Sequence, residues 1–391
     1  MQTRLVVSCP GKAILTGEHA AVYSKAVVAA TVDLRLRVFS QPTCDKLLSL
    51  NFIELGYIFV VPISTLSCIY GAIESLSHPG DIELLVRKLA SDGKVSLPKN
   101  AQLASAIFVA IYLYCSILAS SACSGLSLSI KSDIPLGAGL GSSAAYSAAM
   151  SASLLFHSYK FDRNTPGTDI NALVNSWAFR AEQVVHGTPS GVDNCTVING
   201  GFVKYSKGLP IETFYSGIPL QFLIVDTLVP KNTKTMVAKV AVDYNSDKPG
   251  VKSAIETIDS ISNSLYGILK QTIHLPSSGT HPQQIELNMC QDQIATLITK
   301  NQDQLEFLGV SHNSLDNIVR AAGGCGYSAK LTGGGGGGCA LVFVPQTKSD
   351  PDSLDTLKSA IEAYGYRIYS TKMGVSGLEI DFDGSSWTDP L

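Results

Sequence analysis

Residues 135–143 read PLGAGLGSS, and the segments on either side of them define one structural unit. On the N-terminal side Leu126, Leu128 and Ile130 alternate with polar residues, which predicts a half-buried β-strand. On the C-terminal side residues 144–156 form an apolar, alanine-rich stretch that predicts a helix. A glycine loop between a strand and a helix exposes backbone N–H groups and the positive end of the helix, an arrangement suited to binding phosphate groups.

Two other stretches also contain glycine beside basic or polar residues. Residues 10–19 read PGKAILTGEH, and residues 330–338 read KLTGGGGGG. We expect a loop and a short helix over residues 11–21, after a first strand. The glycine run has structured-looking segments on both sides, so a close backbone approach to a ligand or to the other glycine loop is favoured over a flexible linker.

The glycine patterns do not match two common nucleotide-binding motifs. The chain has no GxxxxGK[ST] sequence, which excludes a P-loop of the Walker type. Residues 333–338 satisfy GxGxxG, but consecutive glycines do so trivially, and they lie near the C-terminus instead of opening a βαβ unit.

The composition is typical of a well-packed globular protein. The chain has 391 residues, 45% hydrophobic and 16% charged, and this length predicts two domains. A net charge of −3 gives no reason to expect nucleic acid or an anionic membrane as a partner. Nine cysteines without a CxxC pair favour free thiols in a reducing compartment, so we expect a cytoplasmic protein.

One segment is long and apolar enough to cross a membrane. Residues 101–130 contain no charged side chain, and residues 107–118 are almost wholly apolar. The nearest basic residues, Lys99 and Lys131, flank the segment evenly and set no orientation. Because the segment runs directly into the strand before the glycine loop, a buried core helix is favoured over a membrane helix.

The rest of the chain shows strand and helix patterns in turn. Apolar alternation predicts strands within residues 4–40 and at residues 202–205, 222–225, 340–344 and 367–370. Helical spacing predicts helices at residues 170–187, 237–244, 255–271, 284–308 and 315–322. We place the domain boundary after residue 227, which gives one domain of residues 1–227 and a second of residues 228–391.

Three charged residues outside the glycine loop bear on chemistry. Asp193 lies in the turn-forming sequence HGTPSGVDN of residues 186–194, Glu182 on the predicted helix before it, and Lys12 beside Pro10-Gly11. Each alone has an ordinary explanation, as a turn aspartate, a solvated glutamate and a loop lysine. Together with the phosphate loop they supply what γ-phosphoryl transfer needs: a base, an oxygen ligand for Mg²⁺ and a cation that offsets developing negative charge.

The motifs PGKAILTGEH, PLGAGLGSSAAY, HGTPSGVDN and KLTGGGGGGC together resemble the signature motifs of the galactokinase, homoserine kinase, mevalonate kinase and phosphomevalonate kinase (GHMP) superfamily. Within it the resemblance is closest to the mevalonate kinases, through the HG-x-PSGVDN loop, Tyr146 directly after GSSAA, and LGV before His312. It covers residues 7–344 and is weakest over residues 44–102. It implies a two-domain α+β fold, with an N-terminal domain like the second domain of ribosomal protein S5 and a ferredoxin-like C-terminal domain.

The resemblance also implies roles for individual residues. Asp193 would be the general base, and Lys12 the cation that lowers the pKa of the substrate hydroxyl. Magnesium would be held by Ser143 and Glu182. ATP would contact Lys12, Asn51, Ser132 and the loop residues Gly137, Ala138, Gly139, Leu140, Gly141, Ser142 and Ser143. The acid substrate would lie near Glu18, His19, Tyr146, Ser190, Thr233 and Gly334.

The activity implied is ATP- and Mg²⁺-dependent phosphorylation of the primary hydroxyl of (R)-mevalonate to 5-phosphomevalonate, in isoprenoid and sterol precursor biosynthesis. Family members are often homodimers and are often inhibited by prenyl diphosphates that compete with ATP. Two alternatives stay open: another small-molecule kinase such as a galactokinase, and a catalytically silent module that senses a nucleotide or metabolite. Galactokinases typically have Arg and Asn where this chain has Lys12 and Ile14, and a silent module would have lost one of the catalytic or metal-binding residues.

Three positions depart from the family pattern. Gly334 stands where Ala is usual, which removes a methyl group near the substrate. Leu228 replaces a basic residue found in animal members, and Thr16 stands where His is common. None of these positions is assigned to proton transfer or metal binding.

Overall fold

The structure is a computed structural model that describes residues 4–118, 125–231, 233–271, 281–348 and 350–386. Its strands are β1 (Leu5–Thr16), β2 (Val27–Pro42), β3 (Leu47–Phe52), β4 (Tyr57–Pro62), β5 (Leu126–Ser132), β6 (Phe202–Tyr205), β7 (Glu212–Phe214), β8 (Leu220–Asp226), β9 (Ser328–Leu331), β10 (Cys339–Val344), β11 (Arg367–Met373) and β12 (Glu379–Asp381). Its α-helices are α1 (Ser67–Ile73), α2 (Ile82–Ser91), α3 (Ala101–Leu118), α4 (Ser142–His157), α5 (Gly167–His186), α6 (Val192–Asn199), α7 (Thr233–Asn245), α8 (Val251–Gln271), α9 (His281–Phe307), α10 (Asn313–Gly324) and α11 (Pro351–Glu362). Its short 3₁₀ helices are η1 (Ala20–Tyr23), η2 (Ile53–Leu55), η3 (Ile63–Leu66), η4 (Pro79–Asp81) and η6 (Gln346–Lys348).

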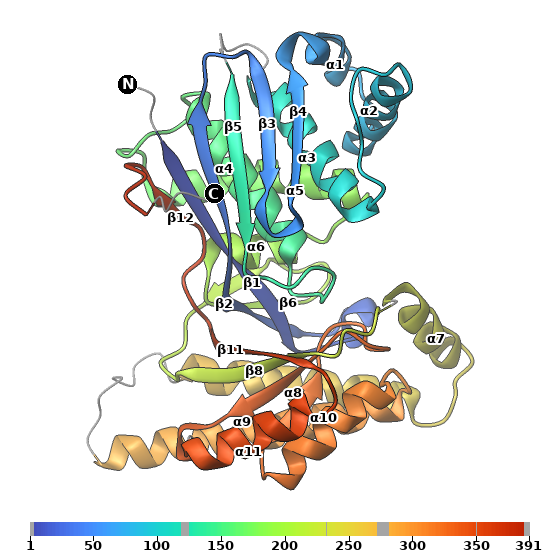
Figure 1. The fold of residues 1–391 in the computed structure, drawn as a ribbon. Coiled ribbons are helices and arrows are strands. Elements are labelled where there is room, and N and C mark those ends of the chain that lie inside the picture. The colour runs from blue at the N-terminus through green and yellow to red at the C-terminus, as the bar shows by residue number, and fades with distance from the viewer. Residues whose placement is uncertain (1–3, 119–124, 232, 272–280, 349, 387–391) are drawn as a thin grey trace.

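The described strands form one mixed sheet. Its central path runs β4-β3-β5-β2-β11-β8-β10-β9, while β1 pairs with β2 and β12, and β6 pairs with β2 and β7. The β3–β5 pair is parallel and the other described strand pairs are antiparallel. Strands β2 and β11 meet at a single register pair, Val32 with Met373, and this narrow junction joins an upper half to a lower half (Figure 1).

In the upper half, helices α3, α4 and α5 lie against one face of the sheet (Figure 1). The alternation predicted for β5 is confirmed, because Leu126, Leu128 and Ile130 are buried beneath these helices. The alanine-rich stretch forms α4, which is buried on nearly all sides, since its small side chains let it approach its neighbours closely.

Helix α3 is the segment that could be mistaken for a membrane span. It is the one helix of the described residues with the length and hydropathy to cross a membrane, and 72% of it is buried inside the protein. Its side chains belong to the same core cluster as those of α4 and β5. The prediction of a buried core helix is therefore confirmed.

In the lower half, α8, α9, α10 and α11 lie together beneath β8 and β11 (Figure 1). Their core includes Val225 from β8, Ile258 from α8, Leu305 from α9, Ile318 from α10 and Ile361 from α11. The predicted helices of this half are present with small shifts at their ends, whereas α11 and β12 had no counterpart among the sequence-based expectations.

Two local expectations were wrong. The segment after Pro10 was expected to leave the strand, but β1 continues to Thr16 through a register shift between Pro10 and Gly11. Asp193 was expected in a turn, but it lies in the first turn of α6, where Gly191 with φ 79° precedes the helix.

The domain limits at residues 227 and 228 stay a prediction. Strand β8, which precedes this boundary, pairs with β10 and β11 in the lower half. Strand β12, near the end of the chain, pairs with β1 in the upper half. No disulfide joins the eight cysteines that lie within the described ranges.

Candidate active site

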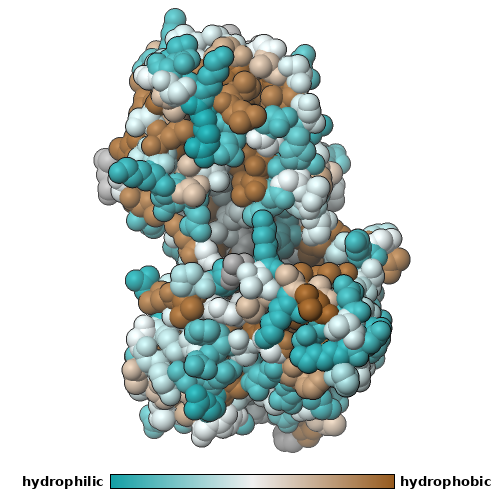
Figure 2. Space-filling model, turned by 90° about the vertical axis from the view of Figure 1, so that its right-hand side faces the viewer, coloured by the Kyte–Doolittle hydropathy of each residue, from teal (hydrophilic) through white to brown (hydrophobic). Residues whose placement is uncertain are grey.

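A cavity of about 1810 Å³ lies where the two halves meet. The four motifs all contribute to its wall, among others through Lys12, Gly139, Asp193 and Gly334. Figure 2 shows the surface hollowed at the waist between the halves. Segments far apart in the sequence therefore share one site.

The glycine loop between β5 and α4 is held against β1. Gly137, Gly139 and Gly141 all have positive φ, which side chains rarely adopt. The backbone N–H of Lys12 donates to the carbonyl of Leu140 at 2.9 Å. A Cβ on Gly141 would lie 2.8 Å from Cγ of Lys12, so the absence of a side chain there lets the lysine pass over the loop.

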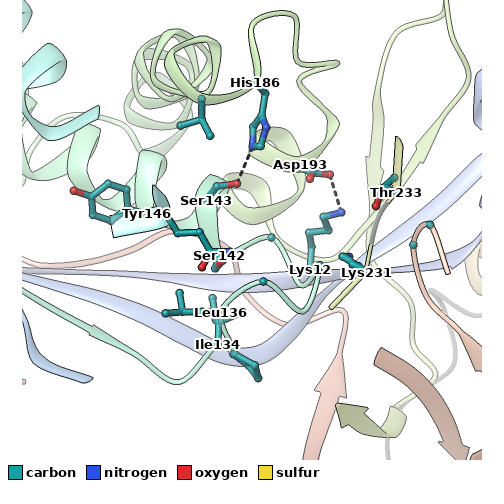
Figure 3. Close-up of a pocket in the computed structure, with 18 of the residues that line it drawn as sticks. Lys12, Ile134, Leu136, Ser142, Ser143, Tyr146, His186, Asp193, Lys231 and Thr233 are labelled. Carbon is teal, nitrogen blue, oxygen red and sulfur yellow. Dashed lines mark hydrogen bonds and ion pairs between the residues drawn. The ribbon is translucent and has the colours of Figure 1, made fainter. Parts of the chain in front are cut away.

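Lys12 and Asp193 form an ion pair inside the cavity (Figure 3). The Nζ atom of Lys12, from β1, lies 2.9 Å from Oδ1 of Asp193, from α6. The lysine side chain is 8% exposed, whereas that of the aspartate is 46% exposed. The carboxylate is thus accessible to a ligand in the cavity while its cationic partner is held within the protein.

Ser143 and Glu182 meet at the start of α4. The hydroxyl of Ser143 donates to Oε2 of Glu182 at 3.3 Å, and that of Ser147 donates to Oε1 at 2.8 Å. Nε2 of His186 lies 3.5 Å from Oε2 of Glu182 and 3.4 Å from Oγ of Ser143. Burial raises the pKa of Glu182, His186 and the hydroxyl donors lower it, and the negative charge of Asp193 raises it.

Glu18 and His19 lie between β1 and the glycine run. The carboxylate of Glu18 forms a fully buried ion pair with Lys330 and accepts from Nδ2 of Asn301 at 3.0 Å. Nε2 of His19 donates to the carbonyl of Gly334 at 3.0 Å, and its Nδ1 is buried without a hydrogen-bond partner among the described residues. Burial lowers the pKa of His19, which favours the neutral ring, and Nδ1 can then accept a hydrogen bond from a ligand.

Comparisons with known proteins agree with this geometry. The family model for the GHMP kinases N terminal domain matches residues 105–201, and that for the GHMP kinases C terminal domain matches residues 287–367. The mevalonate kinase of Schizosaccharomyces pombe is 32% identical over 99% of this chain and 94% of its own length. The human mevalonate kinase is also 32% identical, over 96% of this chain and 94% of its own.

The chain belongs to the mevalonate kinase family.

Solved structures of mevalonate kinases share its fold. The enzyme of Methanococcus jannaschii matches with a TM-score of 0.69 and 21% identity, over 94% of this chain and 98% of that chain. The L. major mevalonate kinase in complex with R-mevalonate matches with a TM-score of 0.66 and 19% identity, over 95% and 96%. The predicted superfamily and its two-domain α+β fold are confirmed.

Most residues that the resemblance to mevalonate kinases selected line the cavity, whereas Asn51, Ala138, Leu140 and Glu182 do not, and the last three are buried. Asn51 is not among the residues that line it, because its side chain lies on the opposite face of β3 from the buried Leu50. Tyr146 lines the cavity, but its hydroxyl donates to the carbonyl of Ala106 at 2.9 Å. Ser132, Ser190 and Thr233 line it as expected. The individual roles of these residues stay predictions.

Lys231 is a cavity residue that the sequence argument did not select. A Cβ built on Gly139 would lie 1.6 Å from its Nζ, so the ammonium group lies directly against the glycine loop. Burial lowers the pKa of Lys231, and the nearby charge of Lys12 lowers it further. The sequence offered one signal for Lys231: it lies three residues after Leu228, and Leu228 departs from the family pattern. Lys12 and Lys231 of this chain therefore flank the glycine loop (Figure 3).

Proposed function

We propose that this chain transfers the γ-phosphoryl group of ATP to the primary hydroxyl of (R)-mevalonate, forming 5-phosphomevalonate and ADP for isoprenoid and sterol precursor biosynthesis. The observation that carries the proposal is the 2.9 Å pair of Lys12 and Asp193 in the cavity that also contains the glycine loop. Curated relatives of about the same length are mevalonate kinases from fungi and animals, which favours mevalonate over galactose as the substrate.

The side chains divide the reaction between proton transfer and charge stabilisation. Asp193 accepts the hydroxyl proton as the substrate oxygen forms a bond to the γ-phosphorus and the bond to the bridging oxygen of ADP breaks. The ammonium group of Lys12 stabilises the attacking oxygen and the transferring group. The phosphates bind to the N–H groups of the glycine loop and the first turn of α4, and Lys231 adds a second cation there.

The residues near the start of α4 fit the Mg²⁺ ion that the family implies. Ser143 and Glu182 offer oxygen atoms, and a divalent cation would favour the ionised form of a carboxylate whose pKa is raised by burial. No group of three or more His, Cys, Asp or Glu side chains within the described residues could hold a metal. Mg²⁺ commonly takes one or two carboxylates and completes its shell with phosphate oxygens and water. When bound, it would neutralise charge on the transferring phosphoryl group.

The substrate end of the cavity offers complementary groups. Nδ1 of His19 can accept a hydrogen bond from a substrate hydroxyl, and the side chains of Ser190 and Thr233 can donate to its carboxylate. Lys12 and Asp193 hold the reacting hydroxyl at the other end. This arrangement binds the acid by polar contacts on both sides of the reacting atom.

Further properties follow from the family resemblance and the composition. We propose a cytoplasmic homodimer that prenyl diphosphates inhibit by competing with ATP, and that has no nucleic acid or membrane partner. Burial of α3 in the core and the net charge of −3 support the last point.

The substrate assignment can be tested with one set of assays. ADP release in the presence of Mg²⁺ is measured with mevalonate, galactose, homoserine and phosphomevalonate, and with the Asp193→Asn variant as a control for contaminating kinases. We expect rapid turnover with mevalonate alone. Equal or faster turnover of another substrate would leave the fold assignment intact and refute the choice of mevalonate, while ATP binding without turnover would favour the silent sensing module.

A further inference from the structure

The helix that carries Glu182 and the helix that carries Asp193 are joined through an unusual turn at Gly187. Gly187 has φ 70° and ψ −74°, and the N–H of Thr188 donates to the carbonyl of His186 at 2.8 Å. A hydrogen bond across one residue at these angles defines a γ-turn with positive φ, which is rare and strained. The turn ends α5 and redirects the chain towards α6, so its conformation helps to set where Asp193 lies relative to Glu182.

The imidazole of His78 holds this turn from outside the four motifs. Its Nε2 lies 3.1 Å from the carbonyl oxygen of Gly187, and its Nδ1 lies 3.0 Å from the backbone N of Gly80. Because Nδ1 accepts from an N–H group while Nε2 faces a carbonyl, the neutral ring with its proton on Nε2 satisfies both contacts. One side chain thereby connects η4 to the strained turn.

The backbone of His78 is held in place by its own hydrogen bonds. Its backbone N–H donates to Oδ2 of Asp81 at 3.0 Å, and the N–H of Asp81 donates to the carbonyl of His78 at 2.9 Å. These reciprocal bonds cap η4, which leads directly into α2, and α2 buries Ile82, Val86 and Leu89 in the upper core. Because the backbone of His78 is fixed, its side chain can hold its hydrogen-bond partner in one place.

We propose that His78 is a positioning residue for phosphoryl transfer: it fixes the turn at Gly187 and, through it, the placement of Asp193 relative to Glu182. The expected effect of His78 on kcat rests on the proposed function, whereas its effect on the turn at Gly187 rests on hydrogen-bond geometry. His78 lies in the part of the chain, residues 44–102, where the family resemblance is weakest.

Two substitutions separate the contact with the turn from the capping of η4. In His78→Asn, the side-chain oxygen can still accept from Gly80, but the shorter amide cannot reach the carbonyl of Gly187. In His78→Gln, the amide nitrogen can reach Gly187, while the close acceptor for Gly80 is lost. We expect kcat to fall about 10-fold or more in His78→Asn and to stay near wild type in His78→Gln, with KM for ATP little changed in both. The reverse order, or full activity of both variants, would overturn the proposal.

Amide hydrogen exchange tests the structural half without relying on activity. The peptide that covers residues 184–191 contains the N–H of Thr188, whose hydrogen bond closes the turn. Its exchange should be about fivefold or more faster in His78→Asn than in wild type or His78→Gln. Unchanged exchange in His78→Asn would refute the proposal. Wild-type protein that fails to phosphorylate mevalonate would instead refute the proposed function and leave the exchange result as the measure of His78.

Discussion

Replacing Lys330 by methionine should lower the free energy of unfolding by about 3–5 kcal/mol, because it leaves the carboxylate of Glu18 buried without its countercharge. The side chains of this ion pair are 1% and 0% exposed, so water cannot screen the remaining charge. After the substitution the carboxylate of Glu18 would keep, among the described residues, the neutral donor Asn301 at 3.0 Å. Glu18→Gln should cost a similar amount, because Lys330 would keep only the carbonyl of Leu331, at 2.6 Å.

The double variant decides whether the two side chains act as a pair. With both charges removed neither position holds a buried charge without its partner, and the loss should be within about 2 kcal/mol of wild type, which implies a coupling of at least about 4 kcal/mol. Unfolding in urea at neutral pH, followed by circular dichroism, measures all four proteins. The exposed pair of Arg163 and Asp383, with side chains 58% and 69% exposed, is the matched control and should show a coupling below about 1 kcal/mol. Additive losses at Glu18 and Lys330 would refute the reasoning.

Three further predictions concern the reaction. Asp193→Asn should lower kcat by about 10²–10⁴-fold with little change in KM for ATP. The double variant with Lys12→Met should lose far less kcat than the product of the two single losses, and steady-state kinetics in which the losses multiply would contradict the pairing. Glu182→Gln should raise the Mg²⁺ concentration that gives half-maximal activity, and a titration like that of wild type would remove its metal role. Gly334→Ala should raise KM for mevalonate more than KM for ATP, because its Cβ would lie 2.8 Å from Oγ1 of Thr233. An unchanged KM for mevalonate would contradict this and would mean that α7 shifts to make room for the methyl group.

The strand–loop–helix unit around residues 135–143 was predictable because its signals are local. The alternation of β5 and the alanine content of α4 each match the environment that the structure provides. Local signals failed where pairing decides. Pro10-Gly11 reads as a turn, yet β1 continues because its residues on both sides of the register shift hydrogen-bond to β2. The turn formers before Asp193 do form a turn, but they did not reveal the short helix that follows it.

The site was predictable in part for a different reason. No spacing rule brings Lys12 to Asp193; the two residues were selected by the chemistry that phosphoryl transfer needs and by the resemblance to a known family. Contacts made by residues outside the family motifs could not be predicted from the resemblance. Lys231 reaches the phosphate loop only because Gly139 lacks a side chain, and His78 meets Gly187 across 109 residues of chain. Asn51 shows the converse, since a residue carried over by resemblance lies outside the cavity wall.

The narrow junction in the sheet determines how the chain connects the two halves. The chain enters the lower half before Leu220 and leaves it after Met373, and these two residues face each other in register. Met373 also pairs with Val32 of the upper half. The two crossings of the chain therefore lie side by side, and elsewhere the halves are held together by contacts such as the buried ion pair of Glu18 with Lys330.

The junction divides the residues proposed for the reaction between the two halves. The residues proposed for proton transfer, charge stabilisation and magnesium binding belong to the upper half (Asp193, Lys12, Ser143 and Glu182), whereas the lower half contributes Lys231, Thr233 and Gly334. The distance between the two sets is therefore set by the contacts between the halves, among them the buried ion pair of Glu18 with Lys330. A ligand that fills the cavity contacts both sets, so its binding adds to the contacts that hold the two halves together.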